Sequence, residues 1–318
     1  MDNRKVVIIG DGAVGSTTAY TLMLRDYVNE IVIIDINKDK ADGDVLDMVH
    51  GMPFVTNKII KSGTYSDLAD AHIIIITAGV GQKPGETRSD LLKRNLNVFD
   101  AIIENIKKYL NDEMIILVVT NPVDVLSYYT YKKLNISSSR VIGSGTVLDS
   151  ARLKYLLSKD TSIDPRNIHA FVVGEHGDSE VSAFSVSSIG GMPVSTYCDK
   201  CGKCKNKLSN LCEIHNEVVN SAYEIIAKKG STYYAVALAV DKIVDTILNN
   251  RNSVLTVSTL VKDQFMGKIK DVYISLPVVV NSSGVVKILE LTYSPLEISK
   301  IIESANKVKE AIDELKIS

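Results

Sequence analysis

Short aliphatic runs alternate with longer amphipathic segments through the first 145 residues. Strands of this continuous apolar character are typical of parallel sheets covered by helices on both faces, because neither face of such a sheet meets water. The alternation therefore predicts a doubly wound α/β domain, with its strands in the order 3-2-1-4-5-6. The runs lie at 6–9, 31–34, 58–61 (the weakest), 73–76, 114–119 and 141–142.

The pattern changes after about residue 145. Segments 183–194, 252–261 and 272–292 are typical of antiparallel strands, with Gly190-Gly191 and Asn281-Ser282-Ser283-Gly284 as hairpin turns. Long helices are expected at about 213–228 and 233–249. The chain is thus divided into a parallel-sheet domain at 1–145 and an α+β domain with antiparallel strands at 146–318.

A last helix is predicted to begin at Ser294-Pro295-Leu296-Glu297. This sequence is a capping box with proline at the first helical position. An apolar stripe at helical spacing follows, which indicates core or subunit packing rather than chemistry. Its members are Leu296, Ile298, Ile301, Ile302, Ala305, Val308, Ile312 and Leu315.

Composition restricts the class of protein. The chain has 318 residues, 45% of them apolar and 23% charged, and a net charge of −2. These values are typical of a globular protein and give no electrostatic footprint for nucleic acid. The longest apolar runs are too short to span a bilayer, and the first strand begins too early to leave room for a signal peptide. We therefore expect a soluble, cytoplasmic protein that binds neither nucleic acid nor membranes.

The first predicted strand ends in a Gly-x-Gly-x-x-Gly turn at Gly10, Gly12 and Gly15. In this context the turn lets backbone approach a pyrophosphate, and the N–H groups of the following helix, from about Val14, face its charge. Asp35 ends the next strand, where a carboxylate accepts hydrogen bonds from ribose hydroxyls and repels a 2′-phosphate. The motif predicts a Rossmann fold that binds NAD rather than NADP. A purely structural turn and a flavin site are the alternatives.

A loop with Gln82, Pro84-Gly85 and Arg88 follows the predicted strand at 73–76. Loops at the carboxyl ends of parallel strands face the ligand crevice. Arg88 could polarise a substrate oxygen. The uncharged Gln82 could discriminate between a charged and an uncharged group at the other end of the substrate. The alternative interpretation is a solvated surface loop.

A proton donor with its partners is indicated near the centre of the chain. His176 lies in Gly174-Glu175-His176-Gly177-Asp178, and an imidazole can donate and reclaim a proton near neutral pH. Asp149 could orient it, and Arg152, one helical turn further on, could hold a carboxylate bidentately. Asn121 closes another strand and could contact a substrate oxygen. Taken individually, each of these residues could instead lie on the surface, form a structural salt bridge or stabilise a turn.

Together these motifs resemble those of the lactate/malate dehydrogenase family over nearly the whole chain, and its bacterial L-lactate dehydrogenases in particular. The resemblance implies that His176 is the acid/base, Asp149 its partner, Arg152 the carboxylate anchor and Arg88 a lid arginine. It also implies that Asn121 and Thr232 line the substrate pocket, that Asn121 and Ser144 lie near the nicotinamide, and that the protein is a homotetramer. The implied reaction is hydride transfer from NADH to pyruvate, giving L-lactate, in glycolysis and fermentation.

Gln82 favours pyruvate over oxaloacetate. Family members that prefer malate usually have arginine at this position, and oxaloacetate's second carboxylate would be desolvated beside an uncharged amide. Malate dehydrogenase is the alternative.

The resemblance places Lys154 and His169 at the positions of the basic residues with which bacterial members bind the activator fructose 1,6-bisphosphate, and His169 matches the family residue. Lysine stands at 154 where the family has arginine, so a bidentate phosphate contact is lost there. Allosteric activation is an open expectation, and an ordinary surface lysine with a structural histidine is the alternative.

Four cysteines, Cys198, Cys201, Cys204 and Cys212, are not explained by the dehydrogenase interpretation. Their spacing resembles zinc or iron–sulfur ligand sets, but a single short cluster is a weak signal, and we assign no metal. A non-catalytic NAD(H) sensor with a cysteine switch is a further alternative, although a sensor would not need His176, Asp149, Arg152 and Arg88.

Overall fold

The computed structural model describes residues 4–81, 88–200 and 207–315; in the helices that flank the gaps, the side chains of 88–89, 198–200 and 207–210 are not described. An eight-stranded sheet in the order β14-β13-β6-β5-β4-β1-β2-β3 is its main element. The six parallel strands confirm the predicted order 3-2-1-4-5-6. They are β1 (Lys5–Ile9), β2 (Glu30–Ile34), β3 (Ile59–Ser62), β4 (Ile73–Ile76), β5 (Ile115–Val118) and β6 (Val141–Gly143).

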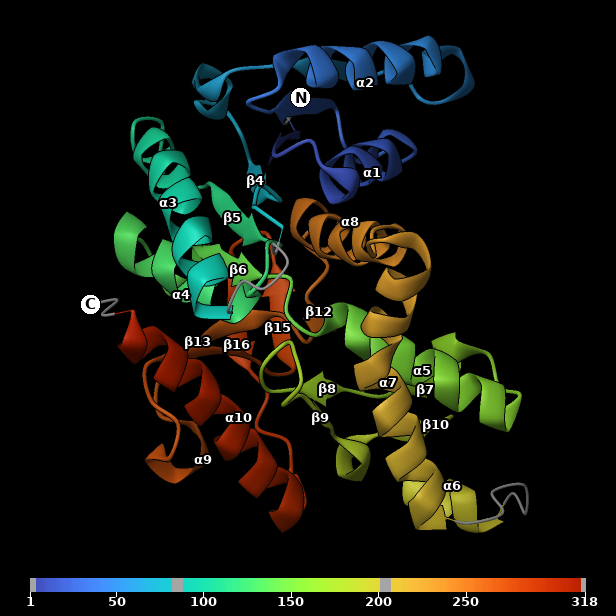
Figure 1. Ribbon diagram of the computed structural model, residues 1–318. Helices are drawn as coiled ribbons and strands as arrows, with labels where there is room; N and C mark the ends of the chain where they lie inside the picture. The colour runs from blue at the N-terminus through green and yellow to red at the C-terminus, as the bar shows by residue number, and fades with distance from the viewer. Residues whose placement is uncertain (1–3, 82–87, 201–206, 316–318) are drawn as a thin grey trace.

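Every residue of β1, β2, β4 and β5 is buried, as the apolar runs predicted. Helices cover the sheet, and Figure 1 shows α1 and α2 at the end of the molecule that also holds the N-terminus. The helices of this first half are α1 (Ala13–Met23), α2 (Lys38–His50), α3 (Arg88–Lys107) and α4 (Val123–Leu134).

Two strands from the second half of the chain extend the large sheet. β13 (Ser258–Val261) pairs antiparallel with β6, and β14 (Val272–Ser275) pairs antiparallel with β13. The sequence predicted antiparallel strands in these segments but not their place in the first sheet. The second half of the chain is thus joined to the large sheet through β6, the outermost parallel strand on that side. The domain boundary placed at residue 145 stays a prediction.

The second half also forms three small antiparallel sheets. The Gly190-Gly191 and Asn281–Gly284 turns join β10 to β11 and β15 to β16, as predicted. Segment 183–194 is less regular than expected, because a 3₁₀ turn occupies Phe184–Val186. The strands are β7 (Ile168–His169), β8 (Val172–Val173), β9 (Val181–Ser182), β10 (Ser188–Ile189), β11 (Met192–Pro193), β12 (Ser253–Leu255), β15 (Val278–Asn281) and β16 (Gly284–Ile288).

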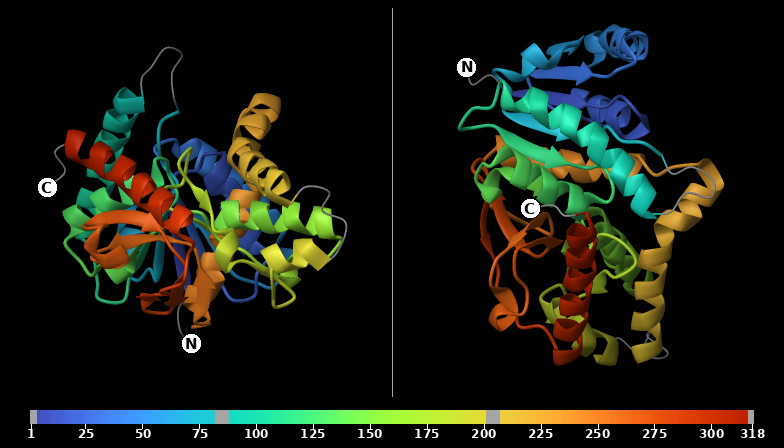
Figure 2. Two further views of the ribbon diagram at one scale, coloured as in Figure 1. Left: turned by 90° about the horizontal axis from the view of Figure 1, so that it is seen from below. Right: turned by 60° about the vertical axis from the view of Figure 1, so that its left-hand side comes forward.

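Long helices complete this half, and Figure 2 shows α7 and α10 running along it. The capping box at Ser294 begins α10 as predicted, and most of its apolar stripe is buried or partly buried. Leu296 is 67% exposed, so this member of the stripe does not pack into the core of the single chain. The helices are α5 (Val147–Thr161), α6 (Val194–Lys200), α7 (Lys207–Lys229), α8 (Tyr234–Leu248), α9 (Gln264–Gly267) and α10 (Pro295–Glu314).

Candidate active site

The glycine turn forms a surface that fits the phosphates of a dinucleotide. A Cβ at Gly15 would lie 1.8 Å from the Gly10 carbonyl oxygen, so α1 packs against the turn only because Gly15 has no side chain. A Cβ at Gly12, in contrast, would have no heavy atom of the described residues within 4 Å, which leaves the backbone open to a ligand. The first turn of α1, which includes Val14, contains no acidic residue. Its N–H groups are therefore available to an anion.

Asp35 is held in place at the end of β2. Its Oδ2 accepts a hydrogen bond from the Asp11 N–H at 2.6 Å, and its Oδ1 accepts one from the Asn37 N–H at 2.8 Å. These bonds fix the carboxylate beside the glycine turn, where an adenosine ribose would lie against a bound pyrophosphate. The residues of this site therefore fit NAD, and a 2′-phosphate would meet negative charge there.

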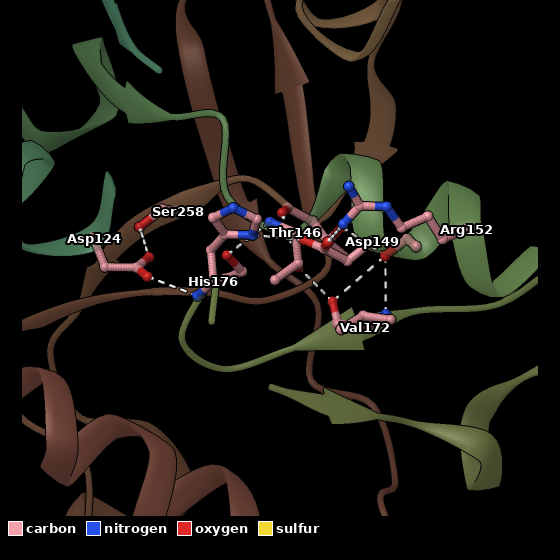
Figure 3. Close-up of polar contacts among 10 residues, drawn as sticks. Asp124, Thr146, Asp149, Arg152, Val172, His176 and Ser258 are labelled. Carbon is pink, nitrogen blue, oxygen red and sulfur yellow. Dashed lines mark hydrogen bonds and ion pairs between the residues drawn. The ribbon is translucent and has the colours of Figure 1, made fainter. Parts of the chain in front are cut away.

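His176, Asp149 and Arg152 form one hydrogen-bonded group, in which the contact of Asp149 with His176 was expected from the sequence and that with Arg152 was not. His176 Nδ1 lies 2.6 Å from Asp149 Oδ2, and Arg152 Nη1 donates to Asp149 Oδ1 at 2.5 Å (Figure 3). The Asp149 side chain is only 2% exposed, whereas the His176 side chain is 24% exposed. The carboxylate is thus buried between two cationic groups, while the imidazole is partly exposed to solvent.

Three elements hold the loop that presents His176. Gly174 exchanges two 2.8 Å backbone hydrogen bonds with Ser275 at the end of β14. The Glu175 N–H donates to Ser304 Oγ on α10, and the His176 N–H donates to Asp124 Oδ2 on α4, both at 2.8 Å. The loop is therefore attached to the large sheet and to one helix from each half of the chain.

Hydrogen bonds between α5, with its N-cap residue Thr146, and β8 hold Asp149 in place. Thr146 Oγ1 donates to the Val172 carbonyl at 2.5 Å, and the Val172 N–H donates to Ser150 Oγ at 2.9 Å (Figure 3). Both hydroxyl-bearing residues are buried. Since β8 leads into the His176 loop, these bonds set the distance between the helix that carries Asp149 and the strand that leads to His176.

The electrostatics of this group favour a protonated His176. Burial lowers the pKa of His176, but the charge and hydrogen bond of Asp149 outweigh burial and raise it to about 9. Burial would likewise raise the pKa of Asp149, yet His176 and Arg152 hold it below its ordinary value. At neutral pH the histidine therefore holds a proton that it can deliver to a bound carbonyl oxygen.

Two acidic residues of the site were missed by the sequence analysis. Asp124 is buried and accepts from both the His176 N–H and Ser258 Oγ, and burial raises its pKa to about 6. Glu180 is also buried, beside Asp149 and His176. Asp124 could have been suspected, because it stands three residues after Asn121 in a strand-to-helix turn. Glu180 lies only four residues after His176, but its approach to Asp149, 31 residues away, gives no signal in the sequence.

The remaining predicted site residues occupy the same edge of the sheet or adjoining segments. Asn121 follows β5, and the Ser144 N–H, just after β6, donates to the Val118 carbonyl at 2.8 Å. Thr232 lies half-buried between α7 and α8. Arg88 begins α3, but its side chain lies outside the described residues, as does the whole of Gln82.

The predicted activator residues lie on α5 and β7. Lys154 is partly buried, and burial together with the charge of Lys242 lowers its pKa; His169 is exposed. Of the four cysteines, only the side chain of Cys212 is described, as a free and exposed thiol, so the cysteine cluster lies outside the described residues.

Comparison with known protein families shows to which family the chain belongs. Residues 4–143 match the NAD-binding domain of lactate/malate dehydrogenase, and residues 146–317 match its α/β C-terminal domain. The chain belongs to the lactate/malate dehydrogenase family. This membership confirms the resemblance drawn from the sequence motifs, and the match to the NAD-binding domain confirms NAD as the cofactor.

Individual members of the family are similar to the chain over its full length. An L-lactate dehydrogenase of Thermoanaerobacter sp. is 54% identical, covering 99% of this chain and 100% of the relative. One of Acetivibrio thermocellus is 52% identical, covering 99% and 98% respectively. Among solved structures, a lactate dehydrogenase from a Medee basin deep-sea metagenome library superimposes with a TM-score of 0.95 at 42% identity, covering 99% of this chain and all of that one.

Proposed function

We propose that this protein is an L-lactate dehydrogenase that reversibly reduces pyruvate to L-lactate with NADH. The observation that carries the proposal is the His176–Asp149–Arg152 group at the carboxyl edge of a sheet whose glycine turn fits NAD. Full-length relatives named L-lactate dehydrogenase support it.

Each residue of the group has a role in this reaction. NADH, when bound, supplies the hydride that adds to the keto carbon. His176 delivers its proton to the carbonyl oxygen, and Asp149 orients the imidazole and stabilises its cationic form. Arg152 pairs with the substrate carboxylate, and Arg88 stabilises the negative charge that develops on the carbonyl oxygen.

Product analysis tests this function. Incubation with pyruvate and NADH should give L-lactate, identified by chiral chromatography, in amounts equal to the NADH consumed. His176→Ala, purified in parallel, should bind NADH while losing about 10³-fold in turnover, because the general acid is gone. Consumption of NADH without L-lactate would refute the proposal, and so would full activity of the alanine variant.

We further propose that the protein works as a cytoplasmic homotetramer that fructose 1,6-bisphosphate activates through Lys154 and His169. The support for the activator is electrostatic: Lys154 is partly buried with a second cation, Lys242, acting on it. A phosphate group would offset both charges. The described residues contain no helix long and apolar enough to cross a membrane.

Addition of the bisphosphate tests the activator site. The pyruvate concentration at half-saturation should fall several-fold in the wild type, but not in Lys154→Gln. Lys93→Gln is a control that removes an unrelated lysine. An identical response in the wild type and Lys154→Gln would mean that the bisphosphate does not act through this residue.

A further inference from the structure

Glu180 is a buried acid that the reaction described above does not use. It stands at the end of the His176 loop, immediately before β9, and its N–H donates to the Gly177 carbonyl at 3.1 Å. The residue is 6% exposed. A carboxylate oxygen of Glu180 lies within 4.8 Å of ligand atoms of both Asp149 and His176. The loop therefore places a second carboxyl group against the catalytic pair.

One oxygen of this second carboxyl group has no hydrogen-bond partner among the described residues. Glu180 Oε1 is buried and has no hydrogen-bond partner in the ranges 4–81, 88–200 and 207–315. A buried oxygen without a partner costs free energy, and a buried unpaired charge costs much more. Its surroundings therefore favour the neutral, protonated acid.

The neighbouring charges decide which of the two acids keeps the proton. Asp149 contacts both cations of the group, His176 and Arg152, so it stays ionised. Burial and the charge of Asp149 raise the pKa of Glu180 to about 9, although His176 and Arg152 act in the opposite direction. Glu175, on the same loop, raises it further. Repulsion between two buried carboxylates therefore favours the neutral form of Glu180.

Arg152 has two tasks that compete. In this structure its Nη1 is hydrogen-bonded to Asp149, yet a substrate carboxylate requires the same guanidinium. As Arg152 turns to the substrate, Asp149, whose side chain is only 2% exposed, loses a donor. A protonated Glu180, whose carboxyl oxygen lies within 4.8 Å of Asp149, can become a replacement donor through a small movement of its side chain.

We propose that Glu180 is a positioning residue, a neutral carboxyl group that donates a hydrogen bond to Asp149 when Arg152 engages the substrate carboxylate. The inference rests on the proposed function, because it assumes that Arg152 binds such a carboxylate. Glu180 does not contact substrate; it acts through Asp149 on the orientation of His176.

Two variants separate this role from simple packing. Glutamine keeps a neutral donor, whereas leucine fills similar space without one. We expect kcat/KM for pyruvate at pH 7 to be about tenfold lower in Glu180→Leu than in Glu180→Gln, since the missing bond is to a charged acceptor. Thermal unfolding and NADH titration of both variants establish that each is folded and binds cofactor. Equal kcat/KM values in the two folded variants would overturn the donor role.

The pH profile tests whether Glu180 is neutral. Because a protonated Glu180 loses its proton only near pH 9, together with His176, Glu180→Gln changes no charge below that pH, and the alkaline midpoint of pyruvate reduction should fall by less than about 0.5 pH unit. If Glu180 is ionised, the glutamine variant loses a negative charge beside His176, and the midpoint should fall by about one unit or more. That fall would overturn the proposal. Absence of pyruvate turnover in the wild type would instead refute the proposed function, so the two failures are distinguishable.

Discussion

At the scale of single residues, the pairing of Asp149 with His176 sets the proton affinity of the site. The folded environment raises the pKa of His176 to about 9, so the imidazole is cationic at neutral pH. Pyruvate reduction consumes that proton, whereas lactate oxidation needs the neutral ring. Reduction should therefore be fast below pH 9 and fall as the pH rises through that value, while oxidation should rise over the same interval.

Replacing Asp149 by asparagine tests this assignment. Asp149→Asn removes the charge that outweighs the burial of His176, so the pKa of the imidazole should fall and the alkaline limb of pyruvate reduction should move to lower pH. At pH 7 the loss in kcat/KM should be on the order of 10²-fold or more. Steady-state rates between pH 5 and 10 provide the measurement. An unmoved limb would mean that another group titrates.

The residues proposed as catalytic could be selected from the sequence because each has a local signature. His176 stands between loop glycines, and Asp149 and Arg152 are one helical turn apart. Asp124 and Glu180 were missed, since their importance comes from contacts with residues 52 and 31 positions away, Asp124 with His176 and Glu180 with Asp149. No spacing rule reports contacts of that range.

At the scale of elements, the His176 loop depends on close packing against α10. Gly174 has φ +94°, and a Cβ there would lie 2.6 Å from Ser304 Oγ. Both the positive φ and the contact require glycine. The loop also contains Gly177, whose Cβ would approach only the end of the flexible Glu175 side chain, at 3.3 Å. The two glycines thus form a matched pair for mutation.

Gly174→Ala should destabilise the fold by roughly 1–3 kcal/mol and lower kcat by at least about tenfold, because the loop must shift to relieve the strain. Gly177→Ala should do much less of either. Urea unfolding and steady-state kinetics of both variants provide the comparison. Comparable effects at the two positions would show that the anchoring by β14 and α10 is unimportant.

The Gln82–Arg88 loop is the element that remains known only from its sequence. Gln82→Arg should raise kcat/KM for oxaloacetate relative to pyruvate by about 10²-fold, since the new charge pairs with the second carboxylate. The ratio of the two constants is the relevant measurement, because it is insensitive to losses in overall activity. An unchanged ratio would remove Gln82 from the specificity assignment.

At the scale of the whole molecule, apolar residues remain on the surface of the single chain. Leu238 and Tyr234, on the same face of α8, are 54% and 66% exposed, and Tyr155 on α5 is 63% exposed. Such surfaces commonly mark contacts between subunits. Light scattering should give a mass of about four chains, and Leu238→Glu should lower it. A wild-type protein that remains a monomer would contradict the proposed assembly.

The architecture was only partly predictable at this scale. The aliphatic runs predicted the order of the parallel strands, because burial on both faces leaves a direct pattern in the sequence. The addition of β13 and β14 to the same sheet depends on the pairing of Ser258 with Gly143, across more than 100 residues. The hydrophobic pattern of a strand is the same whichever sheet it joins. The pairing of β13 with β6 could therefore not be predicted from the sequence.

The choice of substrate by the wild-type enzyme is the most direct test of the central claim. NADH oxidation should be measured with pyruvate and with oxaloacetate, at matched concentrations and neutral pH. The account predicts that kcat/KM for pyruvate exceeds that for oxaloacetate by at least about 10²-fold, the cost of an unpaired buried carboxylate. A preference for oxaloacetate would contradict the assignment as a lactate dehydrogenase, and turnover of neither substrate would contradict the proposed role of the His176–Asp149–Arg152 group.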